Sequence, residues 1–177
     1  MAQERTFRID VAAEINRHFD DSSLSPDAQP KVAIITGAPA VGKTTFRQQR
    51  YSSGYVLVDA AQIFLNLTPG VVIPFPDAFE PAMELIGRQV VRRAIAERRH
   101  IVTEICIVAE PGDSLNELVA AMQEIGYEAV VQMLTCDPET AVQRNLTRGD
   151  FNISSYYAQP YHRKWLMEAA AAAKGVT

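Results

Sequence analysis

Short apolar runs rich in β-branched residues alternate along the chain with segments in which apolar residues recur at helical spacing. The short runs are typical of strands buried in a parallel sheet and cover residues 31–36, 55–59, 100–105 and 128–136. The other segments predict helices over residues 43–50, 77–99, 113–126, 137–148 and 160–174. Because parallel strands need crossover connections, the alternation predicts an α/β fold, a parallel sheet of at least four strands with helices on both faces.

The first 29 residues are expected to precede this α/β unit. Apolar residues among charges predict a helix over 7–19, and the turn-forming residues that follow predict a linker. A length of 177 residues is usual for one domain. We therefore expect a single domain overall, with an N-terminal helix and linker over 1–29 and the α/β domain over 30–177.

Two segments are predicted to be irregular and to lie near a site. Residues 66–77 contain three prolines and a glycine, which favours a loop that borders a substrate pocket. Residues 149–159 are polar and aromatic, and their composition favours a mobile lid over a core element. No fifth strand is predicted after the lid.

Charge and cysteine usage narrow the function classes. A net charge of −4 argues against a general affinity for nucleic acid, and the arginines within 88–99 are interpreted as a solvated helix face. Cys106 and Cys136 lack the spacing of a metal site. No signal peptide or membrane span is evident, so we expect a cytoplasmic protein without a membrane partner.

The strongest motif lies between the first predicted strand and the next predicted helix. Residues 37–44 match the phosphate-binding pattern G-x-x-x-x-G-K-[ST], in which backbone N–H groups and a helix N-terminus converge on phosphate oxygens. The pattern predicts ATP and Mg²⁺ as cofactors; a plain strand-to-helix turn is the alternative. The predicted cofactor-binding residues are Gly37, Ala38, Pro39, Ala40, Val41, Gly42, Lys43, Thr44 and Thr45.

Within this motif two side chains have predicted roles. Lys43 is expected to reach the β- and γ-phosphates as a catalytic cation, and the Thr44 hydroxyl is expected to bind Mg²⁺. Thr45 is more typical of helix structure than of a ligand.

Two acidic residues end predicted strands, where ligands bind in open parallel sheets. They are Asp59 and Glu104. One is expected to orient Mg²⁺ and the other to face the substrate hydroxyl. Asp59 is a candidate catalytic, metal-binding and substrate-binding residue, and Glu104 is a candidate substrate-binding residue. The alternative for each is a cap of the next helix or loop.

Arg144 and Arg148 lie four residues apart on one predicted helix that leads into the lid. Both guanidinium groups are candidate catalytic groups that stabilise charge on a transferring phosphoryl group. The alternative is a solvated helix face on which they pair with Glu139 or Asp150.

Three stretches together resemble the zeta-toxin family of small-molecule P-loop kinases. They are IITGAPAVGKTTFR, HIVTEICI and LVAAMQEIGYEAVVQMLTCDPETAVQRNLTR. The first includes Arg47, and the second resembles the third strand of the family with its terminal glutamate, here Glu104. The resemblance implies a P-loop NTPase fold similar to nucleoside kinases, with a lid. It also implies transfer of the ATP γ-phosphate to a hydroxyl of a sugar nucleotide, typically UDP-N-acetylglucosamine, and control by a small antitoxin.

The chain departs from this family at the second strand. Members carry two aspartates separated by one residue, the later one being the base, and here the sequence is Asp59-Ala60-Ala61. Two hypotheses follow: an ATP-dependent kinase acting on a small hydroxyl-bearing molecule, or a catalytically inactive ATP-binding switch or toxin-like module whose helix 7–19 docks a partner. A GTPase is disfavoured because no Asn-Lys-x-Asp signature is present.

Overall fold

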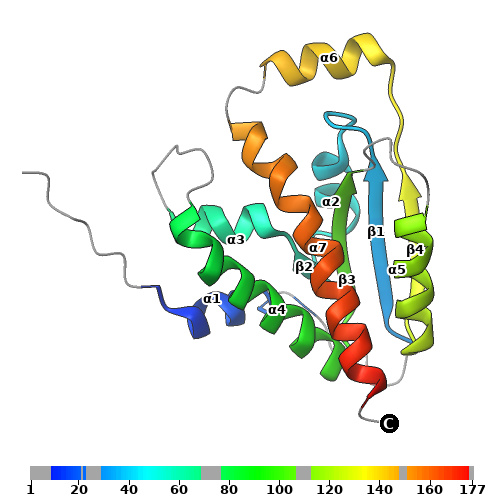
Figure 1. Cartoon of the computed structure of the whole chain (residues 1–177). Coiled ribbons are helices and arrows are strands. Elements are labelled where there is room, and N and C mark those ends of the chain that lie inside the picture. Colours follow the sequence, from blue (N-terminus) through cyan, green and yellow to red (C-terminus); the bar gives the residue numbers. More distant parts are fainter. Residues whose placement is uncertain are drawn as a thin grey trace, which may run out of the picture.

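The computed structural model describes residues 9–20, 22, 29–68, 77–106, 113–147 and 151–175. A four-stranded parallel sheet with the strand order β2-β3-β1-β4 forms its centre (Figure 1). The strands are β1 (Lys31–Gly37), β2 (Val56–Val58), β3 (Ile101–Cys106) and β4 (Glu128–Met133). The predicted α/β class and the parallel sheet are confirmed, and the described residues contain no fifth strand.

Within the described residues, seven α-helices and one short 3-10 helix connect and cover these strands. They are α1 (Val11–Arg17), α2 (Lys43–Arg50), α3 (Ala60–Leu67), η1 (Asp77–Phe79), α4 (Glu80–Ala96), α5 (Asp113–Glu124), α6 (Pro138–Thr147) and α7 (Phe151–Lys174). The predicted helices over 43–50, 77–99, 113–126 and 137–148 are thereby confirmed within a few residues. The N-terminal helix is shorter than the predicted 7–19, and residues 1–8 lie outside the described part.

Apolar side chains pack on both faces of the sheet. Alternate residues of β1 point to opposite faces and so belong to different clusters. Val32 and Ile34 belong to the larger core, to which α3, α4, α5 and α7 contribute. Ala33 and Ile35 belong to a smaller core on the other face, against which Phe46 of α2 packs. Figure 1 shows α4, α5 and α7 together on one side of the sheet. This arrangement places the carboxyl ends of all four strands at one edge, where the loop after β1 and the acids after β2 and in β3 meet.

One helix was missed by the sequence patterns. Residues 60–67 form α3, whose first turn is capped by Asp59 and whose apolar face buries Ile63 and Phe64. The predicted loop over 66–77 is therefore wrong for residues 66 and 67, because this short amphipathic helix runs up to the prolines. Residues 69–76 of that loop lie outside the described residues.

The predicted lid is also corrected in part. Residues 151–159 are helical and belong to α7, which continues through Pro160 instead of beginning there. The predicted start at Pro160 rests on the preference of proline for the first position of a helix, whereas here Pro160 lies in the interior. Residues 148–150 lie outside the described part, so the segment that joins α6 to α7 stays a prediction.

None of the helices in the described part of the chain is both long and apolar enough to cross a membrane.

Candidate active site

The loop after β1 has a backbone that only small residues allow. Gly37 has a φ of 141° and Gly42 a φ of 97°, both left-handed values that favour glycine. A side chain at Gly37 would also collide with the carbonyl oxygen of Leu134. Gly42 caps α2 without a side-chain hydrogen bond. The first N–H groups of α2 are thus left for an anion, as the phosphate-loop pattern predicts.

The Lys43 side chain is folded back onto this loop. Its Nζ donates to the carbonyl oxygens of Gly37, at 3.0 Å, and Ala38, at 2.8 Å, and lies 3.3 Å from Cys106 Sγ. Lys43 is only 6% exposed. The ammonium group is therefore held at the mouth of the loop by weak neutral acceptors, which a phosphate oxygen can replace.

Glu104 connects β3 to two side chains of α2. Thr44 Oγ1 donates to Glu104 Oε2 at 3.0 Å, and Arg47 Nε donates to Glu104 Oε1 at 2.7 Å. Arg47 and Glu104 are both buried. Because a buried charge needs a partner, this ion pair fixes the carboxylate next to the residue predicted to bind Mg²⁺. The predicted role of Glu104 toward an acceptor stays a prediction.

Asp59 lies on the other side of Arg47. Its Oδ1 accepts from the backbone N–H of Gln62 at 3.1 Å and so caps α3, the alternative that the sequence left open. Its Oδ2 lies 3.9 Å from Arg47 Nη2. One guanidinium group therefore lies between Asp59, which follows β2, and Glu104 of the neighbouring strand β3. The prediction that Glu104 ends its strand is wrong, because β3 continues to Cys106 through its pairing with β1. The site contains a chain of charges from Asp59 through Arg47 to Glu104.

His162 of α7 completes the site and was not predicted as a site residue. Its Nε2 accepts from the backbone N–H of Ala60 at 2.7 Å, and its Nδ1 lies 2.8 Å from the backbone oxygen of Glu104. In the sequence His162 lies near Tyr161 and Trp165, a pattern that allows stacking on an adenine but is more typical of an aromatic packing face. The ring centroid of Trp165 lies 6.2 Å from that of His162. No motif spacing reveals the contact, because His162 is 102 residues from Ala60 along the chain.

A pocket of about 510 Å³ lies beside the loop, between α2, the end of β4 and α6. Its walls include Val41, Thr45, Phe46 and Arg144. The Arg144 guanidinium faces the loop, with Nη1 3.9 Å from the place that a side chain at Gly42 would occupy. Arg144 has no ion pair with any residue that the structure describes, so the predicted pairing with Glu139 is not seen. Arg148 and Asp150 lie outside the described residues.

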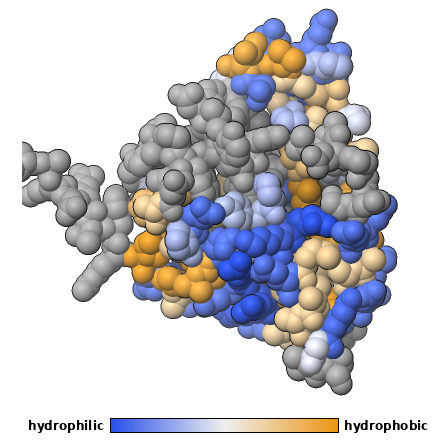
Figure 2. Space-filling view, viewed as in Figure 1, coloured by the Kyte–Doolittle hydropathy of each residue, from blue (hydrophilic) through white to orange (hydrophobic). Residues whose placement is uncertain are grey.

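The helix that carries Arg144 is exposed. None of the residues of α6 is buried, and its Val142 and Leu146 are 56% and 73% exposed. Figure 2 shows hydrophobic surface at the top of the molecule, where Figure 1 places α6. Few contacts hold α6 in place, which suits a helix that adjusts when a ligand binds.

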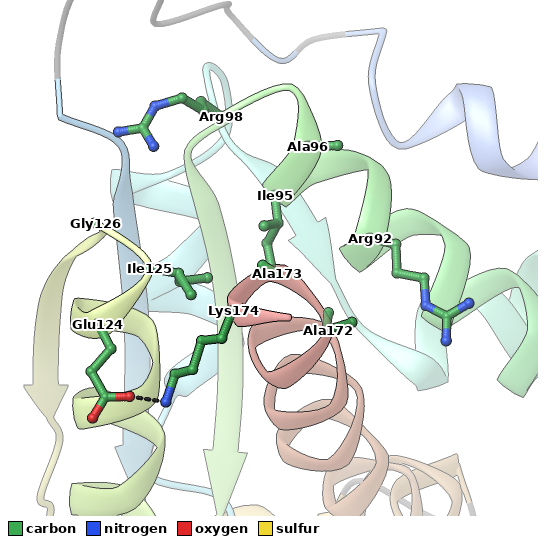
Figure 3. A pocket seen from close by; sticks show the side chains of 11 residues that line it. Arg92, Ile95, Ala96, Arg98, Glu124, Ile125, Gly126, Ala172, Ala173 and Lys174 are labelled. Atoms are coloured by element: carbon green, nitrogen blue, oxygen red, sulfur yellow. Dashed lines mark ion pairs between the residues drawn. The ribbon is translucent and has the colours of Figure 1, made fainter. Parts of the chain in front are cut away.

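A second pocket, of about 700 Å³, lies at the opposite end of the sheet (Figure 3). Ile95, Ile125 and Ala173 line it, and an ion pair between Lys174 and Glu124 closes one side. These residues precede β3 and β4 or end α7, so they lie at the amino ends of the strands. Since parallel sheets bind ligands at the carboxyl ends, the pocket beside the loop is the better candidate despite its smaller volume.

The remaining histidines and cysteines have structural surroundings. His100 Nδ1 accepts from the backbone N–H of Lys31 at 2.9 Å, and burial lowers the pKa of this imidazole. His18 Nδ1 lies 2.9 Å from the carbonyl oxygen of Leu57. Cys106 and Cys136 are free thiols. Among the described residues no three histidine, cysteine or acidic side chains are grouped as metal ligands.

Comparison with known proteins adds a family to this geometry. A family model described as "Zeta toxin" matches residues 15–164. A structure from a characterisation of the PezAT chromosomal toxin-antitoxin system of Streptococcus pneumoniae superimposes with a TM-score of 0.59 at 16% identity, covering 94% of this chain and 70% of that one.

A structure of the Pnkp1/Rnl/Hen1 RNA repair complex superimposes with a TM-score of 0.52 at 19% identity, covering 88% of this chain and 49% of that one. At these identities the structural matches concern the fold, and the chain spans about half the length of the second match. No curated protein sequence matches the chain.

Proposed function

Because the chain belongs to the zeta-toxin family and has the fold of P-loop kinases, we propose that it transfers the γ-phosphate of ATP to a hydroxyl of a small molecule, such as a sugar nucleotide. The observation that carries the proposal is that the phosphate loop and helix α2 are connected through side chains to both acids, Glu104 and Asp59. Glu104 holds Thr44 and Arg47, and Arg47 reaches toward Asp59. The loop that would hold the phosphoryl donor, ATP, and the acids that would face the phosphoryl acceptor are thus fixed relative to each other.

The loop fits a nucleoside triphosphate with Mg²⁺. Residues 37–44 offer backbone N–H groups and the uncapped N-terminus of α2, and Lys43 is positioned to exchange its carbonyl acceptors for phosphate oxygens. Thr44 and Asp59 would hold Mg²⁺, which neutralises charge on the phosphates when bound. The neighbouring pocket would take the nucleoside, with Thr45 in its wall.

The acceptor side lacks a second aspartate. Ala60 and Ala61 follow Asp59, so Asp59 is the acid nearest to an acceptor hydroxyl at this strand end. Loss of a general base typically costs 10²–10⁴ in rate. Phosphoryl transfer depends chiefly on positioning and electrostatics, so this loss need not abolish it. Arg144 and Arg148 would stabilise charge on the transferred group.

A small antitoxin-like protein is the proposed regulator, since one structural relative comes from a toxin-antitoxin system. The N-terminal helix is a poor docking surface for it, because Ile15 and Phe19 belong to the main core. The exposed apolar residues of α6 are better placed to meet a partner.

The proposal is tested by combining binding with turnover. Isothermal titration should show MgATP binding to the wild-type protein and its loss in Lys43→Met. ADP release should then rise on addition of UDP-N-acetylglucosamine or another member of a sugar-nucleotide and alcohol panel. MgATP binding without acceptor-dependent ADP release would support the catalytically inactive switch instead, and absence of MgATP binding would overturn both readings.

A further inference from the structure

We propose that His162 is a positioning residue that sets the spacing of the two acids Asp59 and Glu104, with its Nδ1 donating to the backbone oxygen of Glu104 and its Nε2 accepting from the backbone N–H of Ala60. The proposal rests on the proposed function for its effect on rate, whereas the protonated nitrogen can be tested without any activity. His162 lies on α7, which packs against α3 and β3, and is 1% exposed.

The first contact of His162 fixes the start of α3. Ala60 is the first residue of that helix, so its N–H has no acceptor within the helix. His162 Nε2 supplies the acceptor at 2.7 Å, and the Asp59 side chain supplies the one for Gln62 at 3.1 Å. The imidazole and the Asp59 carboxylate therefore cap the N-terminus of α3 together.

The second contact holds Glu104 within β3, beyond the last residue of β3 that pairs with β2. Strand β2 pairs with β3 as far as the register Val58 to Thr103. One residue further, the backbone oxygen of Glu104 lies 2.8 Å from His162 Nδ1. The same imidazole thus bridges the segment that follows β2 and the residue whose side chain holds Thr44 and Arg47.

These partners permit one protonation state. A backbone N–H only donates, so Nε2 must present its lone pair to Ala60. A backbone carbonyl only accepts, so the proton must be on Nδ1 and point to Glu104. A proton on Nε2 would face the N–H of Ala60 and break that contact. The Asp59 carboxylate lies near Nε2, but its Oδ1 is 3.9 Å away, beyond hydrogen-bond distance.

The consequence for catalysis concerns placement. A shift of about 1 Å in a positioned group can cost about 10²-fold in rate. Loss of His162 would remove the hydrogen bonds at the start of α3 and at Glu104 together, while the loop of residues 37–44 keeps its glycine-determined conformation. The expected signature is a lower kcat with little change in the affinity for MgATP.

The position of the ring proton is tested by NMR of the ¹⁵N-labelled full chain. The measurement uses two-bond couplings between the carbon-bound protons of the imidazole and its two nitrogens. The chain has three histidines, so the His162 signals are those absent from His162→Phe. A proton on Nδ1 and a lone pair on Nε2 are expected from the two hydrogen bonds. A ring protonated at Nε2, or a charged ring, would overturn the proposal whether or not the chain is a kinase.

Variants then separate positioning from folding. Asparagine keeps a donor near Glu104, glutamine keeps an acceptor near Ala60, and His162→Phe removes both. Phenylalanine is expected to lower kcat about 10²-fold, with His162→Asn or His162→Gln recovering part of the loss and the Kd for MgATP changing less than about threefold. Leu166→Val trims the same buried face of α7 and should lower Tm without this loss of kcat. Equal kcat losses in Leu166→Val and His162→Phe would overturn the positioning role.

Discussion

Removal of the Glu104 carboxylate should destabilise the protein strongly. In Glu104→Ala the buried Arg47 loses its partner at 2.7 Å and Thr44 loses its acceptor at 3.0 Å. Breaking a buried ion pair by removing one member costs about 3–5 kcal/mol, because the other charge stays buried and unpaired. Asp59 still lies 3.9 Å from Arg47, so the lower end of this range, about 3 kcal/mol, is expected.

The corresponding change in melting temperature is large enough to measure. For a domain of this length 1 kcal/mol shifts Tm by about 2–4 °C, so Glu104→Ala should melt about 6–12 °C below the wild type. Circular dichroism on heating and urea titration at fixed pH provide the assay. The free energy of unfolding of a typical domain is about 5–15 kcal/mol, so the variant should still fold at low temperature.

A matched control comes from an exposed acid on the edge strand β4. Glu128 pairs with Lys31 at 3.3 Å, with both side chains more than two-fifths exposed. Surface pairs contribute about 0–1 kcal/mol, so Glu128→Ala should change Tm by less than about 4 °C. Equal changes in Glu128→Ala and Glu104→Ala would refute the reasoning from burial. Glu104→Gln, which keeps an acceptor and the shape, should fall between them.

Three further outcomes are expected. Lys43→Met should weaken MgATP binding by isothermal titration while Tm changes by less than about 4 °C, since its present partners are neutral carbonyls. In Gly87→Ala the added methyl would collide with the Trp165 ring, and overpacking of about 1–3 kcal/mol should lower Tm. Burial raises the pKa of Tyr127, so the folded state favours the protonated phenol and its stabilising effect is lost as pH rises above about 10. Urea titrations at pH 8 and above pH 10 should show that the free energy of unfolding falls less with pH in Tyr127→Phe than in the wild type.

Strands β1 and β3 were predictable because each contains an apolar run that the sheet buries, whereas the edge strand β4 is partly exposed. Val32, Ile34 and Ile35 are fully buried, and no amphipathic alternation competes with the strand pattern. Helix α2 was predicted with its observed bounds because it begins at the phosphate loop and ends at a Ser-Ser-Gly turn. Local signals of this kind survive in the folded state when tertiary contacts agree with them.

The errors occurred where tertiary packing overrides local signals. The interior position of Pro160 in α7 could not be read from a residue type that favours helix starts. Helix α3 has only eight residues, and its stabilising cap depends on Asp59 and on His162 from a distant part of the chain. Isolated helices of that length are marginal, so only the folded context makes α3 stable.

The candidate site divides along the same line. The glycines, Lys43 and Thr44 were predicted because their chemistry depends on spacing within eight residues. The resemblance to the zeta-toxin family pointed to Arg47 and Glu104, but their contact is formed across 57 residues and needs the fold. The only signal for His162 was its position near Tyr161 and Trp165, which allows adenine stacking but is more often packing, and neither interpretation predicts its contacts with Ala60 and Glu104.

The alanines after Asp59 are part of the fold and not simply missing chemistry. Ala60 is fully buried, and Ala61 is partly buried against the main core. A carboxylate at position 61 would therefore enter apolar surroundings, where an unpaired charge is costly. The acidic chemistry at this strand end is then left to Asp59, which the start of α3, Arg47 and His162 surround. This concentration of contacts on one carboxylate is the physical reason to place Asp59, and no later residue, opposite the acceptor in the proposed kinase.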